Sequence, residues 1–197
     1  MYLISGCPRS GTHFTAALFQ TIGQRVEHEA RAEDGCVSWK HVATGTFIYP
    51  KRNRITEISN EGFDVVLHQV RNPLKVISSM QTLRQCSWDF MAEHAPGIDP
   101  KAPVIIKGMQ SWLSWNDLIA QQASWRYRVE DTQAVFPEIL SRLGLPEVPF
   151  PEIPHEARES RVKRYKPLKW KKFLKADAEL AEKVRELANN YGYDVED

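Results

Sequence analysis

The sequence predicts an α/β domain in which helices cover both faces of a central parallel sheet. Residues 2–4 and 64–70 have the length and apolar content of buried strands, and residues 125–129 alternate as a strand does. A helical spacing of apolar residues follows each of these segments. Because strands that alternate with helices form parallel sheets covered on both sides, we expect a three-layer α/β/α fold.

The composition is that of one ordinary globular domain spanning residues 1–197. Hydrophobic residues make up 42% of the chain and charged residues 26%. The formal net charge of +1 gives no global field that would attract nucleic acid or a membrane, so we expect neither as a partner. Met1 leads directly into the first expected strand, and no apolar run approaches the roughly 20 residues of a membrane span. We therefore expect no signal peptide and no membrane helix.

The cysteines and histidines show no structural or metal-binding pattern. Cys7, Cys36 and Cys86 are scattered and odd in number, which predicts neither a disulfide framework nor a zinc site and indicates a reduced, cytoplasmic protein. Cys7 is interpreted as a small residue chosen for fit, with a reactive thiol as the alternative. The six histidines lack metal-ligand spacing, so no metal is expected.

The first fifteen residues carry the strongest functional pattern. Gly6 and Gly11 enclose a tight loop, which we call the phosphate loop, between the first strand and a helix that begins at Thr12. Backbone N–H groups and the positive end of the helix would point at one anion there. A nucleotide-triphosphate loop has Lys directly after its last Gly, whereas here the cation is Arg9, inside the loop. The competing interpretation is a solvated turn, which the close framing by strand and helix disfavours.

A second anion-binding pattern follows the strand at residues 64–70. Arg71 stands at the end of that strand, Asn72 can cap the next helix, and Pro73 suits its first position. Ser79 lies eight residues after Arg71, two turns into the helix. Taken alone, this segment is equally well explained as an ordinary strand–helix unit with a surface arginine. Its combination with the phosphate loop favours the functional interpretation.

Residues 8–12 (Pro-Arg-Ser-Gly-Thr) and 71–79 (Arg-Asn-Pro-Leu-Lys-Val-Ile-Ser-Ser) resemble two segments of sulfotransferases that use 3′-phosphoadenosine 5′-phosphosulfate, or PAPS. In that family the first segment binds the 5′-phosphosulfate and the second binds the 3′-phosphate. The resemblance implies a P-loop nucleotide-binding fold, PAPS as co-substrate, and transfer of its sulfuryl group to a hydroxyl or amine. The donor-binding residues that it implies are Pro8, Arg9, Ser10, Gly11, Thr12, His13, Phe14, Arg71, Ser79 and Lys166.

Two of these residues can also be explained without a role in donor binding. Phe14 occupies the place of an adenine-stacking Trp in many family members, and it fits the apolar face of its helix equally well. Family members close the donor pocket with a late basic loop, and Lys166 is the candidate here. It belongs to a strongly basic stretch, residues 158–175, whose only acid is Glu159 and which is otherwise read as a solvated surface segment.

An acceptor hydroxyl needs a general base within hydrogen-bond reach. Tyrosylprotein sulfotransferases use a Glu about twenty residues after the basic residue of the loop, and Glu29 lies twenty residues after Arg9. We therefore expect Glu29 to be the base, with His28 and then His13 as alternatives, and Arg9 to stabilise charge on the leaving phosphate. In a parallel α/β unit the segment after the first helix normally returns to the edge opposite the ligand. Residues 26–29 therefore take part only if they run back to the active edge.

The acceptor cannot be identified from the sequence. Its binding loops would come from residues 30–60 and 84–122, whose composition suits a sugar, a phenol or a peptide equally. The oligomeric state is open as well. Two other functions remain as alternatives. One is a P-loop kinase of small metabolites, and the other is a non-catalytic nucleotide-binding module.

Overall fold

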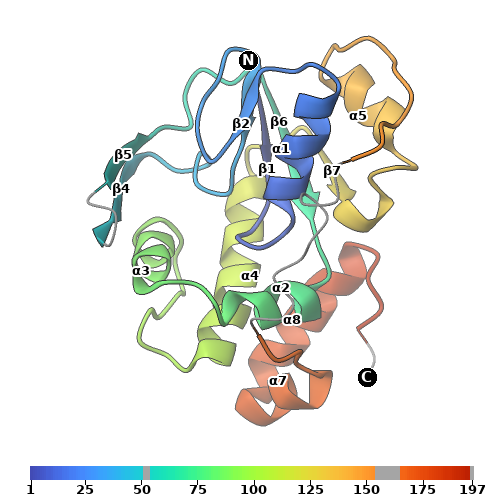
Figure 1. Cartoon of the computed structure of the whole chain (residues 1–197). Helices are drawn as coiled ribbons and strands as arrows, with labels where there is room; N and C mark the ends of the chain where they lie inside the picture. Colours follow the sequence, from blue (N-terminus) through green and yellow to red (C-terminus); the bar gives the residue numbers. More distant parts are fainter. Residues whose placement is uncertain (51–53, 154–164, 196–197) are drawn as a thin grey trace.

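A computed structural model describes residues 1–50, 54–153 and 165–195. Its centre is a sheet of five parallel strands in the order β2-β3-β1-β6-β7 (Figure 1). The strands span the following residues: β1 Tyr2–Ser5, β2 Val26–His28, β3 Gly35–Val37, β6 Val65–Val70 and β7 Trp125–Arg128. The parallel α/β class expected from the sequence is confirmed.

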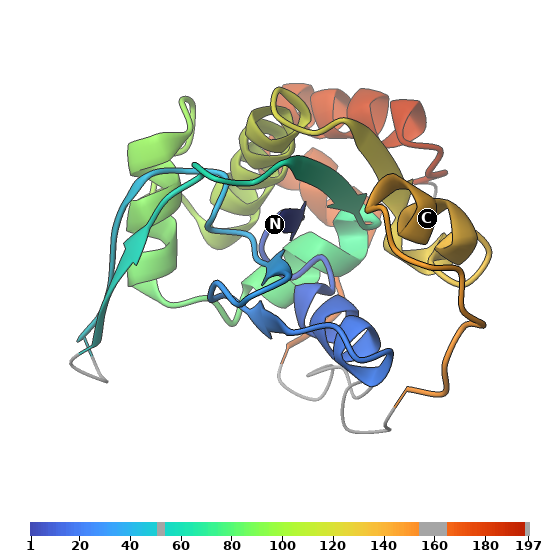
Figure 2. The same ribbon diagram turned by 90° about the horizontal axis from the view of Figure 1, so that it is seen from above.

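Helices pack on both faces of the sheet, so the fold has three layers. Leu3 and Ile4 are neighbours in β1 and belong to two different hydrophobic clusters, because successive strand residues point to opposite faces. Figure 2 shows α1 and α4 on opposite sides of the strands. One cluster includes residues of α1 (Thr12–Thr21) and α5 (Phe136–Arg142). The other cluster includes residues of α2 (Pro73–Met80), α4 (Val104–Ala120) and α8 (Ala178–Asn190).

The remaining elements lie around this core. The antiparallel hairpin of β4 (Gly45–Tyr49) and β5 (Arg54–Ile58) projects beside α3 (Gln85–His94), as Figure 1 shows. A short 3₁₀ helix, η2 (Val129–Asp131), follows β7, and α7 (Trp170–Ala176) packs against α8. The hairpin was not predicted from the sequence. Among the described residues, no helix has both the length and the apolar content needed to cross a membrane.

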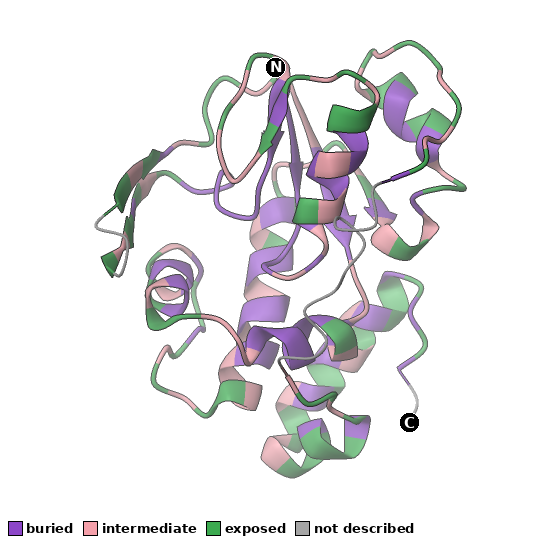
Figure 3. Ribbon diagram, viewed as in Figure 1, coloured by how far each residue is buried: buried purple, intermediate pink, exposed green. Residues whose placement is uncertain are grey.

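The order of the strands marks the carboxyl end of β1 as the place in the sheet where a ligand is expected. From β1 the chain crosses to β2 at one edge of the sheet, returns through β3, and then passes to β6 and β7 on the other side. The order of connections therefore reverses at β1, and open α/β sheets bind ligands outside the strand ends at such a switch point. Figure 3 shows that the strands of the central sheet are largely buried, whereas exposed residues lie on the β4–β5 hairpin and on the outer surfaces of the helices.

His68, in the middle of the sheet, makes the stability of the fold pH-dependent. It is buried, and its Nε2 lies 3.0 Å from Oδ1 of Asn116. The Asn116 amide nitrogen donates to the Trp112 carbonyl at 2.7 Å, which leaves Oδ1 to accept from the imidazole. Burial lowers the pKa of His68 to about 4, so the folded protein holds a neutral ring.

We expect the free energy of unfolding to fall as the pH drops below 6.5, by roughly 1.4 kcal/mol per pH unit until about pH 4. The sign follows because the unfolded chain binds this proton more readily than the folded one. Urea unfolding at pH 7.5 and pH 5.5 measures the effect. In His68→Gln, which keeps a donor for Asn116, the slope should become clearly smaller, and the part that remains includes the contribution of His41, whose pKa burial also lowers. An unchanged slope in that variant would contradict the assignment.

Candidate functional site

The phosphate loop joins β1 to α1 at the carboxyl edge of the sheet. Arg9 and Gly11 have φ values of 77° and 94°, in the left-handed region that costs most residues energy and costs glycine little. A Cβ at Gly6 would collide with the backbone oxygen of Gln69, so the loop approaches β6 as only a glycine allows. The loop then leads directly into a helix of ten residues, which is the geometry expected of an anion site.

One backbone N–H of the phosphate loop is already engaged within the loop. The N–H of Ser10 donates to the carbonyl of Cys7 at 3.0 Å. In this conformation Ser10 therefore offers no backbone donor to an anion. The first N–H groups of a helix have no intrahelical partner, which leaves those of Thr12, His13 and Phe14 for a ligand.

Arg9 joins the two predicted anion-binding segments. Its Nε donates to Oγ of Ser79 at 2.9 Å, and its Nη2 donates to Oγ1 of Thr82 at 2.6 Å. The backbone oxygen of Arg9 accepts from Nη1 of Arg71 at 3.1 Å. Two guanidinium groups and two hydroxyls therefore gather beside one loop. Thr82, which lies just past the end of α2, was not anticipated from the sequence.

The floor of the phosphate loop is the buried amide of Gln69. Its Nε2 donates to the backbone oxygen of Ser10 at 2.7 Å. Its Oε1 accepts from the Tyr127 hydroxyl at 3.0 Å and from the hydroxyl of Thr15. The loop, β6, β7 and α1 thus share one polar contact, and the sequence had not singled out Gln69.

Residues 26–29, which follow the first helix, do reach the edge of the sheet where the phosphate loop lies. Strand β2 is parallel to β3 and β1 and ends at His28, so His28 and Glu29 emerge at the same edge as the phosphate loop. Nε2 of His28 lies 3.1 Å from Oγ1 of Thr12, and the rings of His13 and His28 meet edge to face with centroids 5.3 Å apart. The structure therefore brings all three candidate bases to the start of α1.

Glu29 is held by donors from two other elements. Its Oε1 accepts from Nε1 of Trp39 at 2.7 Å, and its Oε2 accepts from Nζ of Lys40 and the hydroxyl of Tyr49, each at 3.0 Å. The backbone of Glu29 has a φ of 63°, which is strained for a residue of this type. Lys40 is 2% exposed, and its ammonium lies 4.5 Å from the centroid of the Phe47 ring.

These contacts keep the carboxyl group of Glu29 ionised. Burial alone would raise the pKa of Glu29, but the charges of Lys40 and His28, together with hydrogen bonds from Lys40 and Trp39, lower it below its usual value. A carboxylate that is stabilised in this way is a weaker proton acceptor than a free one. Sequence reasoning missed Lys40, because its burial depends on the hairpin that carries Phe47 and Tyr49.

The remaining predicted residues fall into three places. Phe14 is half-buried and packs against the cluster on the α1 face, in agreement with its apolar-face interpretation. The carbonyl of Lys166 accepts from Nε2 of Gln81 at 2.8 Å, so this residue lies against the end of α2, near Ser79. Residues 158–164 of the basic stretch lie outside the described residues.

Cys7 is buried, and burial raises the pKa of its thiol well above the usual value, so it is a packed residue rather than a nucleophile.

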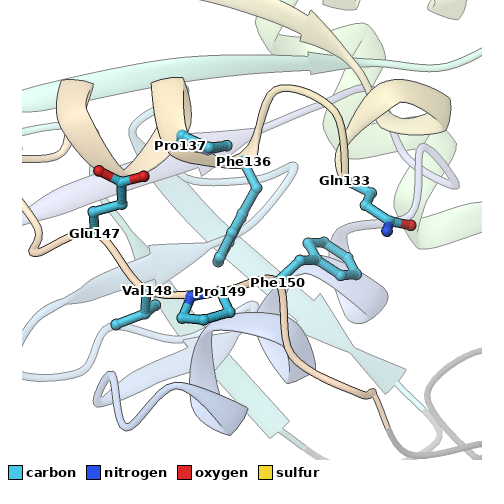
Figure 4. Close-up of a pocket in the computed structure, with 7 residues that line it drawn as sticks. All are labelled: Gln133, Phe136, Pro137, Glu147, Val148, Pro149 and Phe150. Carbon is cyan, nitrogen blue, oxygen red and sulfur yellow. The ribbon is translucent and has the colours of Figure 1, made fainter.

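A cavity of about 250 Å³ lies elsewhere, between α5 and the segment at residues 147–150 (Figure 4). Its lining is mostly apolar and consists of Gln133, Phe136, Pro137, Glu147, Val148, Pro149 and Phe150. None of the site residues predicted from the sequence lines it. The portion of the chain that the structure describes contains no group of three or more His, Cys, Asp or Glu residues arranged to hold a metal.

Comparison of the chain with protein-family models, curated proteins and solved structures finds no match.

Replacement of Lys40 by Met should leave the carboxylate of Glu29 without the cation that neutralises it. We expect Lys40→Met to lower the free energy of unfolding at pH 7 by about 3 kcal/mol, because a partly buried charge loses its partner. Adding Glu29→Gln to the same chain removes that charge and should recover most of the loss. Urea unfolding of both variants measures this. A double variant no more stable than Lys40→Met would show that the charge is not the cause.

Proposed function

We propose that this protein is a sulfotransferase that binds PAPS at the carboxyl edge of its sheet and sulfates a hydroxyl or amine of an acceptor. The observation that carries the proposal is the meeting of the phosphate loop with Arg71 and Ser79 through Arg9. Two anion-binding segments, far apart in the sequence, converge on one place. A nucleotide with phosphate groups on both its 5′ and 3′ positions needs two such segments side by side.

The donor set fits an anionic ligand of this kind. Arginine presents several N–H groups in a rigid fork that matches phosphate oxygens, and both Arg9 and Arg71 lie at this edge. The free N–H groups at the start of α1 add neutral donors and the positive end of a helix dipole. We assign the loop and the helix start to the 5′-phosphosulfate, and Arg71 with Ser79 to the 3′-phosphate.

PAPS supplies a sulfuryl group: the acceptor oxygen bonds to sulfur while the bond from sulfur to the 5′-phosphate oxygen breaks, adenosine 3′,5′-bisphosphate leaves with the electron pair, and a base takes the acceptor's proton. Arg9 and the N–H groups at the start of α1 stabilise the negative charge that develops on the leaving phosphate. His28 lies beside Thr12 and Glu29 lies beside His28, which makes these two side chains the candidates that take the acceptor's proton.

Glu29 and His28 are the two candidates for the base, and their environments differ. The carboxylate of Glu29 already accepts three hydrogen bonds, which stabilise its ionised form and weaken it as a base. The His28 ring is about one-third exposed, and its Nε2 lies 4.0 Å from Oε1 of Glu29. In the arrangement with His28 as the base, the carboxylate stabilises the imidazolium that forms. In the arrangement with Glu29 as the base, His28 positions the acceptor.

The kinase alternative is disfavoured by the residue beneath the phosphate loop. Kinases of this class hold Mg²⁺ through a loop hydroxyl and a carboxylate on a neighbouring strand. Here the side chain of β6 that contacts the loop is the amide of Gln69, which donates to Ser10 instead. The hydroxyl of Thr12 is engaged by His28. A non-catalytic binding module would bind the same nucleotide without turning it over. A measurement of turnover therefore distinguishes it from the proposed enzyme.

The test of the donor site is a calorimetric titration with adenosine 3′,5′-bisphosphate, AMP, ADP, and ATP with Mg²⁺. We expect the bisphosphate to bind most tightly, and Arg71→Ala to reduce the affinity ratio of the bisphosphate to AMP by roughly 10- to 100-fold, as expected for the loss of a charged hydrogen bond. Arg142→Ala, which removes a guanidinium from α5, is the matched control and should leave that ratio unchanged. Absence of a preference for the 3′-phosphate would overturn the proposal, and Mg²⁺-dependent tight binding of ATP would favour a kinase.

The roles of the two candidate bases are separated by Glu29→Gln and His28→Gln. Each variant keeps a side chain of similar size and can still make a hydrogen bond. We expect the variant that removes the base to lower turnover by 10²- to 10⁴-fold while the affinity for adenosine 3′,5′-bisphosphate stays the same. Release of that product from PAPS is measured with a phenol, a sugar and a tyrosine peptide as acceptors. Full turnover in both variants would exclude this pair as the source of the base.

A further inference from the structure

We infer that Gln69 is a positioning residue that turns the phosphate loop toward its ligand before the ligand arrives. The inference rests on the proposed function only for the identity of the nucleotide, because the orientation of the loop matters for any 5′-phosphate. Gln69 lies outside every motif that the sequence presents, and it contacts the loop from below.

The position of Gln69 follows from strand register. Strand β6 lies next to β1, with Ser5 opposite His68, so Gln69 stands one step beyond the last paired residue of β1. The phosphate loop begins there. The side chain of Gln69 is fully buried at 0% exposure. An amide in this place has to find protein partners for both of its ends, because it is shielded from water.

The partners fix the direction of the amide. Oε1 can only accept, and it lies against two hydroxyl donors, those of Thr15 and Tyr127. Nε2 can only donate, and it lies 2.7 Å from the carbonyl oxygen of Ser10. An amide turned the other way would place its Oε1 against that carbonyl oxygen, which is repulsive. The donor end is therefore held on Ser10.

The consequence for the loop follows from the geometry of the peptide bond. A trans peptide unit points its carbonyl and its N–H in opposite directions. The Ser10 carbonyl points toward the amide of Gln69. The N–H of Gly11 belongs to the same peptide unit, so it points away from Gln69, toward the side of the loop where a ligand would bind. Gly11 can adopt the φ of 94° that this orientation requires. Its N–H then joins those at the start of α1 as a donor for the 5′-phosphate.

The role of Gln69 is specific to one end of the nucleotide. Arg71 and Ser79 are held by Arg9 and by their own strand and helix, not by the Gln69 amide. Loss of the Gln69 donor should therefore weaken binding of a 5′-phosphate and spare that of a 3′-phosphate. A general loss of structure would weaken both alike.

The experiment compares the binding of AMP, which carries only a 5′-phosphate, with that of adenosine 3′-monophosphate. Gln69→Glu keeps an oxygen for Thr15 and Tyr127 but, when ionised, cannot donate to Ser10. Because burial raises the pKa of a carboxyl group, the comparison is made at pH 9, where we expect the affinity of this variant for AMP to fall at least 10-fold and its affinity for the 3′-monophosphate to change less than 3-fold. At pH 5.5 the protonated carboxyl can donate again, so the AMP deficit relative to wild type at the same pH should shrink.

Two further variants keep the inference testable. Tyr127→Phe removes a donor to Oε1 while leaving the contact with Ser10, and it should bind AMP within 3-fold of wild type. Gln69→Met has a similar length and no charge, and it should reproduce the AMP loss without the recovery at low pH, even if Gln69→Glu fails to fold. Equal loss for both nucleotides, or wild-type AMP binding in Gln69→Met, would overturn the inference. A wild-type protein that shows no 3′-phosphate preference, but whose AMP binding still depends on Gln69, would contradict the proposed donor and support the positioning role.

Discussion

The close approach of the phosphate loop to β6 is the constraint on which the rest of the site depends. Gly6 is a glycine because a side chain there would strike the backbone of Gln69. That contact lets the Gln69 amide reach the Ser10 carbonyl and lets Arg71, just after β6, reach the carbonyl of Arg9. The loop is thus bonded to its neighbouring strand at two successive carbonyls. A loop held in this way needs little reorganisation to bind an anion, which favours affinity.

The ion pair between Lys40 and Glu29 costs free energy to bury, and its two opposite charges compensate each other. Burial of the Lys40–Glu29 pair removes two ions from water, and such pairs seldom add stability over apolar residues. The backbone strain at Glu29 adds a further cost. Strain and buried charge coincide at one residue beside the start of α1, which is typical of a functional site. Lys40 also offsets the repulsion that an isolated carboxylate would exert on the anionic donor that we propose.

The structural features that could be predicted from the sequence are those that depend on residues close together in the chain. The strands at β1, β6 and β7, the glycine-bounded loop, and the cap of α2 by Asn72 all appear as short patterns. The family resemblance implied that Arg9 and Ser79 bind two ends of one donor, but it did not predict the direct contact between their side chains that the structure has.

The parts that could not be predicted depend on neighbours far away in the chain. Glu29 reaches the active edge because β2 is only three residues long and parallel to β1, and a strand of that length has no clear periodicity. Lys40 looks like an ordinary charged residue until the hairpin at residues 45–58 encloses it. Gln69 and Thr82 act through contacts made across the sheet and with the loop, so neither carries a local signal. The loop turn that engages the Ser10 N–H was likewise invisible in the sequence.

The central claim is that the carboxyl edge around Arg9 and Arg71 binds a nucleotide with both a 5′- and a 3′-phosphate. Amide and guanidinium NMR signals of the protein, followed during titration with adenosine 3′,5′-bisphosphate and separately with ADP, test it most directly. We expect the largest shifts at the amides of Gly11 to His13 and at the side chains of Arg9 and Arg71, and we expect them at lower concentrations of the bisphosphate than of ADP. Shifts centred on the cavity beside α5, or equal responses to the two nucleotides, would contradict it.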